Sequence, residues 1–185
     1  QSIGIETDYV EGMEFDKGFV TPYMAADPAR GEAEVKDVPI LVTDMKIGVI
    51  QEILPLLEAV MQAGKREMVI IADDIVGAAL HTFVINKIRG GLTVIGIKAP
   101  GFGLRKKDYL QDIAILTGAT FIDSEMGMKL MDAKMEYLGG ADRVVATKDK
   151  TTIIGGKGKK EDIDARIAGA KKEMEGLESK HDKLK

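Results

Sequence analysis

The feature that most constrains the fold is an alternation, from residue 68 onward, of short apolar runs with longer segments of helical periodicity. The runs are MVIIA (68–72), TVIGI (93–97), ATFI (119–122), RVVAT (143–147) and TTII (151–154), and helical patterns occupy 76–89 and 104–117. Continuously apolar strands between helices indicate a sheet that is covered on both faces. We therefore predict an α/β fold, in which a layered mixed sheet forms the core and helices flank it.

Residues 1–44 follow a different pattern. The segment IGIETDYVEGMEF (3–15) alternates imperfectly between apolar and polar residues, and glycines interrupt it. Pro22, Pro28, Gly31 and Pro39 then punctuate a long connection before the apolar run PILVT (39–43). This pattern predicts an extra N-terminal layer of β-hairpin-like structure beside the α/β core.

The C-terminal segment 159–185 carries a single apolar stripe on an otherwise charged helical pattern. Apolar residues and one histidine recur at steps of four and three at Ile163, Ile167, Ala170, Met174, Leu177, His181 and Leu184. The sequence starts without methionine and stops inside this pattern without a glycine or proline. We therefore expect a piece of a longer protein, with one domain at 1–158 and a helix at 159–185 that leads toward a further domain.

Composition narrows the class of protein. The chain has no cysteine, which excludes disulfides, zinc–thiolate sites and thiol catalysis. A net charge of −4 argues against nucleic-acid binding, and no apolar run approaches the roughly 20 residues of a membrane helix. We expect a cytoplasmic protein with no nucleic-acid or membrane partner. Ten methionines and no tryptophan are compatible with core filling or with an adaptable binding surface.

The segment KAPGFGLRKKD (98–108) resembles a phosphate-binding loop but lacks the required residues. A Walker-type loop needs a lysine followed by serine or threonine after its second glycine, and Leu104, Arg105 and Lys106 stand here instead. A dinucleotide fingerprint would need glycine at position 106. A small α/β enzyme that binds phosphate or nucleotide through the 98–107 loop remains the alternative function.

Other candidates for chemistry are weak. Asp73 and Asp74 follow a strand, where metal-binding carboxylates often lie, but N-capping of the next helix explains them more simply. His81 and His181 have no serine or carboxylate at triad-like spacing. We predict no catalytic residues and no metal site, so the chain itself is not expected to be an enzyme.

The two helical segments before residue 90 are apolar over more of their circumference than one buried side needs. We expect the first helix to start near Ile53, because Pro55 fits its first turn, and to end before Gly64. One stripe comprises Ile47, Ile50, Leu54, Leu57 and Met61, and a second comprises Val49, Ile53, Leu56 and Val60. In 76–89 the apolar residues spread even wider. Either both helices lie between two layers, or an apolar groove between them stays open for partners.

Several motifs together carry a family resemblance. They are VEGMEFDKGF (10–19), TPY (21–23), ILPLLEAV (53–60), NKIRG (86–90), KAPGFG (98–103), LQDIAILTG (110–118) and KDKTTII (148–154). In this order they closely resemble the apical domain of the bacterial-type (group I, GroEL-like) chaperonin. The resemblance runs across nearly the whole chain and implies that the KAPGFG loop is a structural turn.

The resemblance also implies a binding surface, which in this family captures non-native polypeptides in an apolar groove between two helices. The mobile loop of the co-chaperonin lid binds at the same surface. By position the groove residues are Phe19, Tyr23, Met24, Leu54, Leu57, Leu80, Val84, Ile85 and Asn86. Ala78 and Leu104 stand where the family commonly has acids, which bears on ion pairs between subunits and on lid recognition.

Further expectations concern the assembly. The resemblance implies that ATP and Mg²⁺ are used by equatorial segments of a longer, ring-forming parent, so no cofactor is expected in this chain. The chain alone is expected to be a monomer. Its partners would be unfolded polypeptides and a GroES-like lid.

Overall fold

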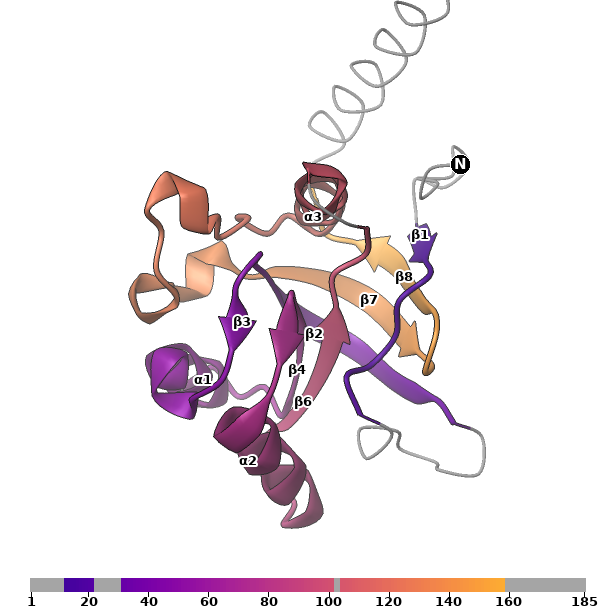
Figure 1. Cartoon of the computed structure of the whole chain (residues 1–185). Coiled ribbons are helices and arrows are strands. Elements are labelled where there is room, and N and C mark those ends of the chain that lie inside the picture. The colour runs from indigo at the N-terminus through magenta and orange to yellow at the C-terminus, as the bar shows by residue number, and fades with distance from the viewer. Residues whose placement is uncertain (1–11, 22–30, 102–103, 159–185) are drawn as a thin grey trace, which may run out of the picture.

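The computed structural model describes residues 12–21, 31–101 and 104–158, and it shows an α/β fold (Figure 1). A six-stranded mixed sheet has the order β1-β8-β7-β2-β4-β6, and β3 and β5 form a small parallel pair. The main strands are β1 (Gly12–Phe15), β2 (Ala33–Val42), β4 (Glu67–Ala72), β6 (Thr93–Lys98), β7 (Gly139–Ala146) and β8 (Thr151–Gly156). The short pair is β3 (Lys46–Ile47) and β5 (Asp74–Ile75), and the helices are α1 (Leu54–Gln62), α2 (Gly77–Ile88) and α3 (Leu104–Thr117). The predicted α/β class and mixed sheet are confirmed.

Strand β4 is buried on both faces and divides the interior into two cores. Met68 and Ile70 point into the core beneath α1 and α2, whereas Val69 and Ile71 point into the core beneath α3. All four side chains have no exposed surface. A strand with two buried faces needs apolar residues at every position, which explains the unbroken run MVIIA. Figure 1 shows α1 and α2 on one side of the sheet and α3 on the other.

Strand β2 joins the parallel and antiparallel halves of the sheet. It runs parallel to β4 over Ile40–Val42 and antiparallel to β7 over Ala33–Ile40. It therefore begins well before the predicted run 39–43, within the segment that the prolines predict to be a connection. Pro39 is tolerated because pairing with β4 starts only at Ile40, so no strand on that side requires an amide proton from position 39.

Two predictions about strands are wrong. The described N-terminal strand β1 does not form a separate hairpin-like layer, because it pairs antiparallel with β8 at the edge of the six-stranded sheet. The run ATFI (119–122) is not a strand, since only Ile122 makes an isolated bridge, to Thr43. Thr43 also donates its hydroxyl hydrogen bond to the carbonyl of Ile122 at 2.9 Å, which holds this segment beside the end of β2.

The helix boundaries follow from local sequence. Pro55 lies in the first turn of α1, where its missing amide proton has no helical acceptor to lose. Gly64 follows this helix with a φ of +84°, a left-handed conformation that glycine adopts without strain. The predicted helix from near Ile53 to before Gly64 is confirmed, as are the helices predicted at 76–89 and 104–117. Tyr23, Met24 and the helix predicted at 159–185 lie outside the described residues.

The segment after β1 is held tightly between two parts of the sheet. The amide of Phe19 donates to the carbonyl of Thr147 at 3.0 Å, and the amide of Lys98 donates to the carbonyl of Gly18 at 3.1 Å. Gly18 lies so close to the β7–β8 turn that a Cβ there would stand 1.7 Å from the oxygen of Thr147. Only glycine fits this position in the observed backbone.

We predict that Gly18→Ala destabilises the fold strongly, because the added methyl group meets backbone atoms that cannot rotate away. A loss of about 3 kcal/mol in the free energy of unfolding is expected in a urea melt, the upper range for overpacking. Gly48→Ala is the matched control, since its Cβ would meet only a side-chain atom of Val76 at 3.9 Å. That variant should stay within about 0.5 kcal/mol of the original chain. Equal melts for the two variants would contradict the close approach at Gly18.

Candidate functional site

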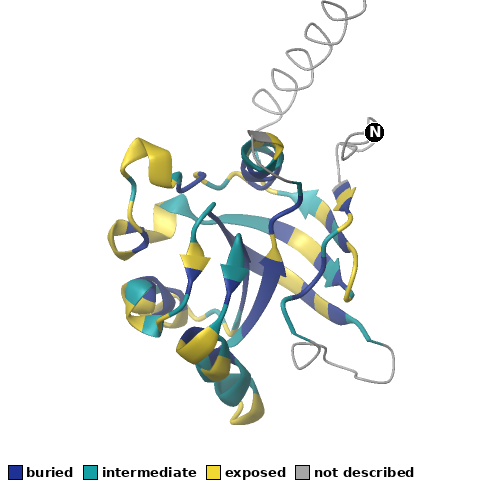
Figure 2. Cartoon of the chain, in the orientation of Figure 1, coloured by how far each residue is buried: buried dark blue, intermediate teal, exposed yellow. Residues whose placement is uncertain are grey.

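Helices α1 and α2 form the outer layer over one face of the sheet. Ile53, Leu56 and Val60 of the α1 region and Phe83 of α2 face inward and are at most 1% exposed. On both helices the remaining surface carries half-buried and exposed residues (Figure 2). Within the described part of the chain, the helices therefore bury one side each and are not held between two layers.

The outward side of α1 combines apolar and polar residues. Leu54 is 40% exposed and Met61 is 49% exposed, while Glu58 and Gln62 are also exposed. The predicted stripe containing Leu57 is partly wrong, because Leu57 is only 6% exposed and belongs to the core under α1.

The physical reason is that the chain is not one helix from 47 to 61. Ile47 lies in β3, a 3₁₀ turn η3 covers Ile50–Glu52, and α1 begins at Leu54. Leu57 stands one turn after Ile53 and therefore shares its buried side, as its backbone hydrogen bond of 3.0 Å to Ile53 shows. The second predicted stripe is buried as expected at Ile53, Leu56 and Val60, whereas Val49 is 45% exposed.

The other predicted groove residues of the helices lie on α2. Leu80, Val84, Ile85 and Asn86 are all half-buried, and Ile88 at the end of the helix is 78% exposed. Leu80 and Val84 are four residues apart and Ile88 follows four later, so these three share one side of the helix. Leu80 also packs against both cores. The helix thus presents an apolar stripe that is only partly covered.

A methionine-rich segment adjoins α1 and was not assigned a place by sequence reasoning. The 3₁₀ turns η5 (Leu130–Asp132) and η6 (Met135–Tyr137) pack against α1. Met131 is 61% exposed and Met135 is 37% exposed. The sequence indicates this segment only through its high number of methionines, and a count of methionines does not show which of them lie on the surface.

The remaining predicted groove residues are not brought to this surface by the described structure. Phe19 is 6% exposed, pairs with Ile97 in an isolated bridge and packs in the core on the α3 side. Tyr23 and Met24 lie outside the described residues. The structure therefore places Leu54, Leu80, Val84, Ile85 and Asn86 on the outer layer, and Phe19 and Leu57 in the two cores.

The cations after the KAPGFG turn contact carboxylates of the chain itself. Lys106 forms an ion pair with Asp73. Lys107 lies 2.9 Å from Asp123 and 2.7 Å from Glu125. The predicted N-capping by Asp73 and Asp74 is wrong, because α2 follows Val76 without a side-chain cap and Asp74 accepts the amide of Ile75. The reason is that β5 pairs with β3 and keeps the chain extended before the helix.

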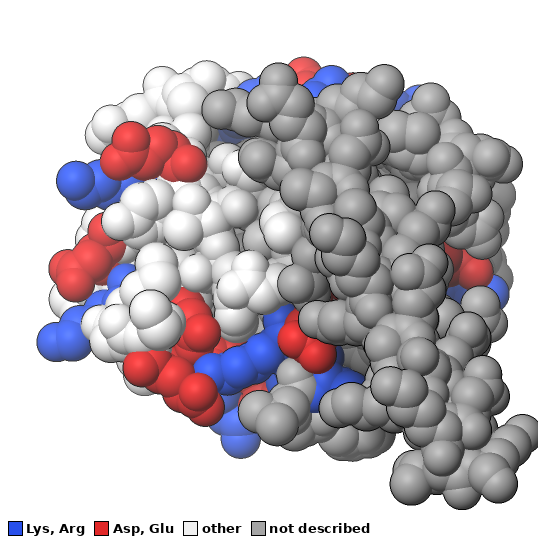
Figure 3. Space-filling view, turned by 90° about the horizontal axis from the view of Figure 1, so that it is seen from above, with Lys and Arg blue, Asp and Glu red and all other residues white. Residues whose placement is uncertain are grey.

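These ion pairs shift the titration of their members. Hydrogen bonds to Glu125 and Asp123 raise the pKa of Lys107 above its usual value, and Lys107 lowers the pKa of Asp123. Asp123 also accepts the amide of Glu125 at 2.9 Å, which caps the 3₁₀ turn η4 (Ser124–Met126). On the face seen from above, basic and acidic groups lie next to one another (Figure 3).

Several kinds of site are absent from the described residues. Within 12–21, 31–101 and 104–158, no three histidine, cysteine or acidic side chains gather as metal ligands would. In the same ranges, no helix has the length and apolar character needed to cross a membrane.

A scan of the chain against models of known protein families finds no match.

We predict a pH-dependent contribution from Asp123, tested with Asp123→Asn, which keeps the capping oxygen but removes the charge. Because the folded pKa of Asp123 lies below its ordinary 3.8, the stabilisation is present above pH 3.8 and is lost as pH falls through the folded value. The variant should unfold more easily than the original chain at pH 7, and the two should converge well below pH 3.8.

The control is Asp132→Asn, at an exposed position with no ion pair to another described residue. Its melting curve should follow that of the original chain at every pH. A gap between Asp123→Asn and the original chain that persists unchanged in acid would show that the charge of Asp123 is not responsible.

Proposed function

We propose that this chain is a polypeptide-binding module, similar to the apical domain of a bacterial-type chaperonin. In this proposal the outer surfaces of α1 and α2 capture exposed apolar segments of unfolded proteins, and a GroES-like lid competes for the same surface. The chain itself performs no chemistry, and ATP with Mg²⁺ would act in equatorial segments of a longer, ring-forming parent in the cytoplasm. The motifs quoted above supply the resemblance on which the family assignment depends.

The observation that carries the proposal is the uncovered apolar surface on two neighbouring elements of one layer. Leu54 and Met61 on α1 and Ile88 on α2 are between 40% and 78% exposed, and Leu80 and Val84 are half-buried. Burial of one such side chain contributes about 1.5–3 kcal/mol when it is complete. A soluble domain gains nothing from leaving several of them in water, so a partner that covers them is the simplest explanation.

The magnitudes also explain why a ring of copies would be useful. Partial burial of four or five half-exposed side chains supplies roughly 3–7 kcal/mol. Association costs at least about 4 kcal/mol in lost translational and rotational freedom. One copy should therefore bind an unfolded chain weakly, and several copies side by side would bind it more tightly because their sites act together.

The phosphate-binding alternative has less support. The two lysines that follow its glycines, Lys106 and Lys107, both lie beside carboxylates of the chain. A phosphate group would have to displace Asp73 and Asp123, or bind beside them against their charge. Because acidic and basic side chains lie next to one another beside α3, this surface would attract a negatively charged nucleotide only weakly.

We predict that Leu54→Glu and Val84→Glu each weaken the binding of a denatured client by about 5- to 150-fold, because the carboxylate must lose water when an apolar segment docks. Leu54→Glu should barely affect stability, since Leu54 is exposed and an acid in the first turn of a helix is favourable. Val84→Glu should destabilise by about 1 kcal/mol, because Val84 is half-buried. Urea melts and fluorescence-detected binding measure the two effects separately.

Two controls belong with this experiment. Ile53→Glu places the same charge next to Leu54 but inside the core, where Ile53 has no exposed surface, and should unfold the domain. Gln111→Glu adds the same charge at an exposed position of α3, on the other face of the sheet, and should change neither stability nor binding. Unaltered client binding by both Leu54→Glu and Val84→Glu would refute the proposed surface.

A further inference from the structure

A cavity of about 310 Å³ lies away from α1 and α2, where three distant segments of the chain meet. It is lined by Asp16, Lys17, Gly18, Phe19, Val20, Lys98, Lys148 and Asp149. The first five follow β1, Lys98 ends β6, and the last two form the turn between β7 and β8. Its volume is at the lower end of the roughly 300–1,000 Å³ that is usual for small-molecule sites. The cavity therefore suits a small molecule better than a folded partner.

The wall of this cavity is rigid. The amides of Phe19 and Val20 donate to the carbonyls of Thr147 and Gly96 at 3.0 and 2.8 Å. The hydroxyl of Thr151 donates to the carbonyl of Lys17 at 2.7 Å. These bonds attach the 17–20 segment to β6 on one side and to the β7–β8 hairpin on the other. A ligand would meet a preformed surface and would not have to order it.

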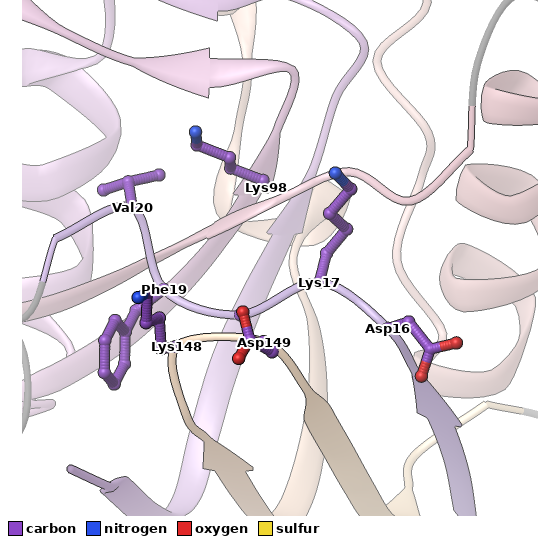
Figure 4. Close-up of a pocket in the computed structure, with 8 residues that line it drawn as sticks. Asp16, Lys17, Phe19, Val20, Lys98, Lys148 and Asp149 are labelled. Atoms are coloured by element: carbon purple, nitrogen blue, oxygen red, sulfur yellow. The ribbon is translucent and has the colours of Figure 1, made fainter.

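The charges around the cavity favour an anion of low charge. The described residues that line it include the lysines Lys17, Lys98 and Lys148 and the aspartates Asp16 and Asp149. Among the residues that the structure describes, none forms an ion pair with Lys98 or Lys148, whereas Lys106, Lys107 and Lys157 are all paired with carboxylates. Figure 4 shows Lys17 and Lys98 directed to the same side of the segment, with Asp16 apart from them at the end of β1.

We propose that this cavity binds a small monocarboxylate with an apolar body, whose carboxylate is held by Lys98 and Lys148. A single negative charge is repelled less by the nearby Asp149 than a phosphate group, which carries about 1.5 to 2 charges near neutral pH. Val20 and the aliphatic stems of the lysines provide apolar contact for the body of the ligand. This site uses no residue of α1 or α2, so it does not depend on the function proposed above.

Benzoate is a suitable probe, titrated into the whole chain at constant ionic strength and followed by amide NMR. We expect saturable shifts at residues 16–20, 98, 148 and 149, with a dissociation constant on the order of 1 mM for so small a ligand. Lys98→Ala combined with Lys148→Ala should weaken binding about tenfold, since each exposed ion pair contributes a few-fold. Lys36→Ala, at an exposed lysine on β2, is the control and should bind as the original chain does.

A variant with the opposite effect separates binding from a loss of folding. Asp149→Asn removes a repelling charge and should bind benzoate about two- to fivefold more tightly. Benzylamine should not bind, and inorganic phosphate should bind more weakly than benzoate. The proposal is overturned if no saturable shift occurs at these residues, if phosphate binds as tightly as benzoate, or if Asp149→Asn fails to strengthen binding.

Discussion

The burial of β4 on both faces is the constraint on which the rest of the structure depends. Alternate residues of this strand enter two separate cores, so each face of the sheet must be covered by its own layer. Helices α1 and α2 cover one face and α3 covers the other (Figure 1). Because α1 and α2 form an outer layer with nothing above them in the described residues, the apolar side chains on their outer sides remain accessible to a partner.

Sequence reasoning succeeded where the local pattern and the tertiary environment agree. The unbroken run at 68–72 predicted a strand with two buried faces, and Gly64 predicted the end of α1, because both signals act within a few residues. It failed where distant segments decide the outcome. The start of β2 at Ala33 depends on β7, which lies more than a hundred residues later, and the pairing of β1 with β8 also joins residues that are more than a hundred positions apart.

The candidate surface was predicted in part. The resemblance assigns Leu54, Leu80, Val84 and Ile85 to the groove, and the structure leaves them exposed or half-buried. The resemblance assigns Leu57 to the groove as well, but Leu57 is buried, because the side on which it lies depends on where η3 ends and α1 begins. Asp73 was expected to cap a helix, but its partner Lys106 is brought to it by the fold. Exposed Met131 and Met135 beside α1 gave no sequence signal beyond composition.

The central claim is that unfolded polypeptide binds on the outer surfaces of α1 and α2. Methyl NMR of the whole chain, titrated with a denatured client, tests it most directly. We expect the methyl signals of Leu54, Leu80, Val84 and Ile88 to shift and broaden together, while the buried methyls of Ile70 and Ile113 stay in place. Shifts confined to residues after the KAPGFG turn would contradict the account. So would the absence of shifts on α1 and α2 at client concentrations up to about 1 mM, because even a single copy of such a surface should bind with a dissociation constant below this value.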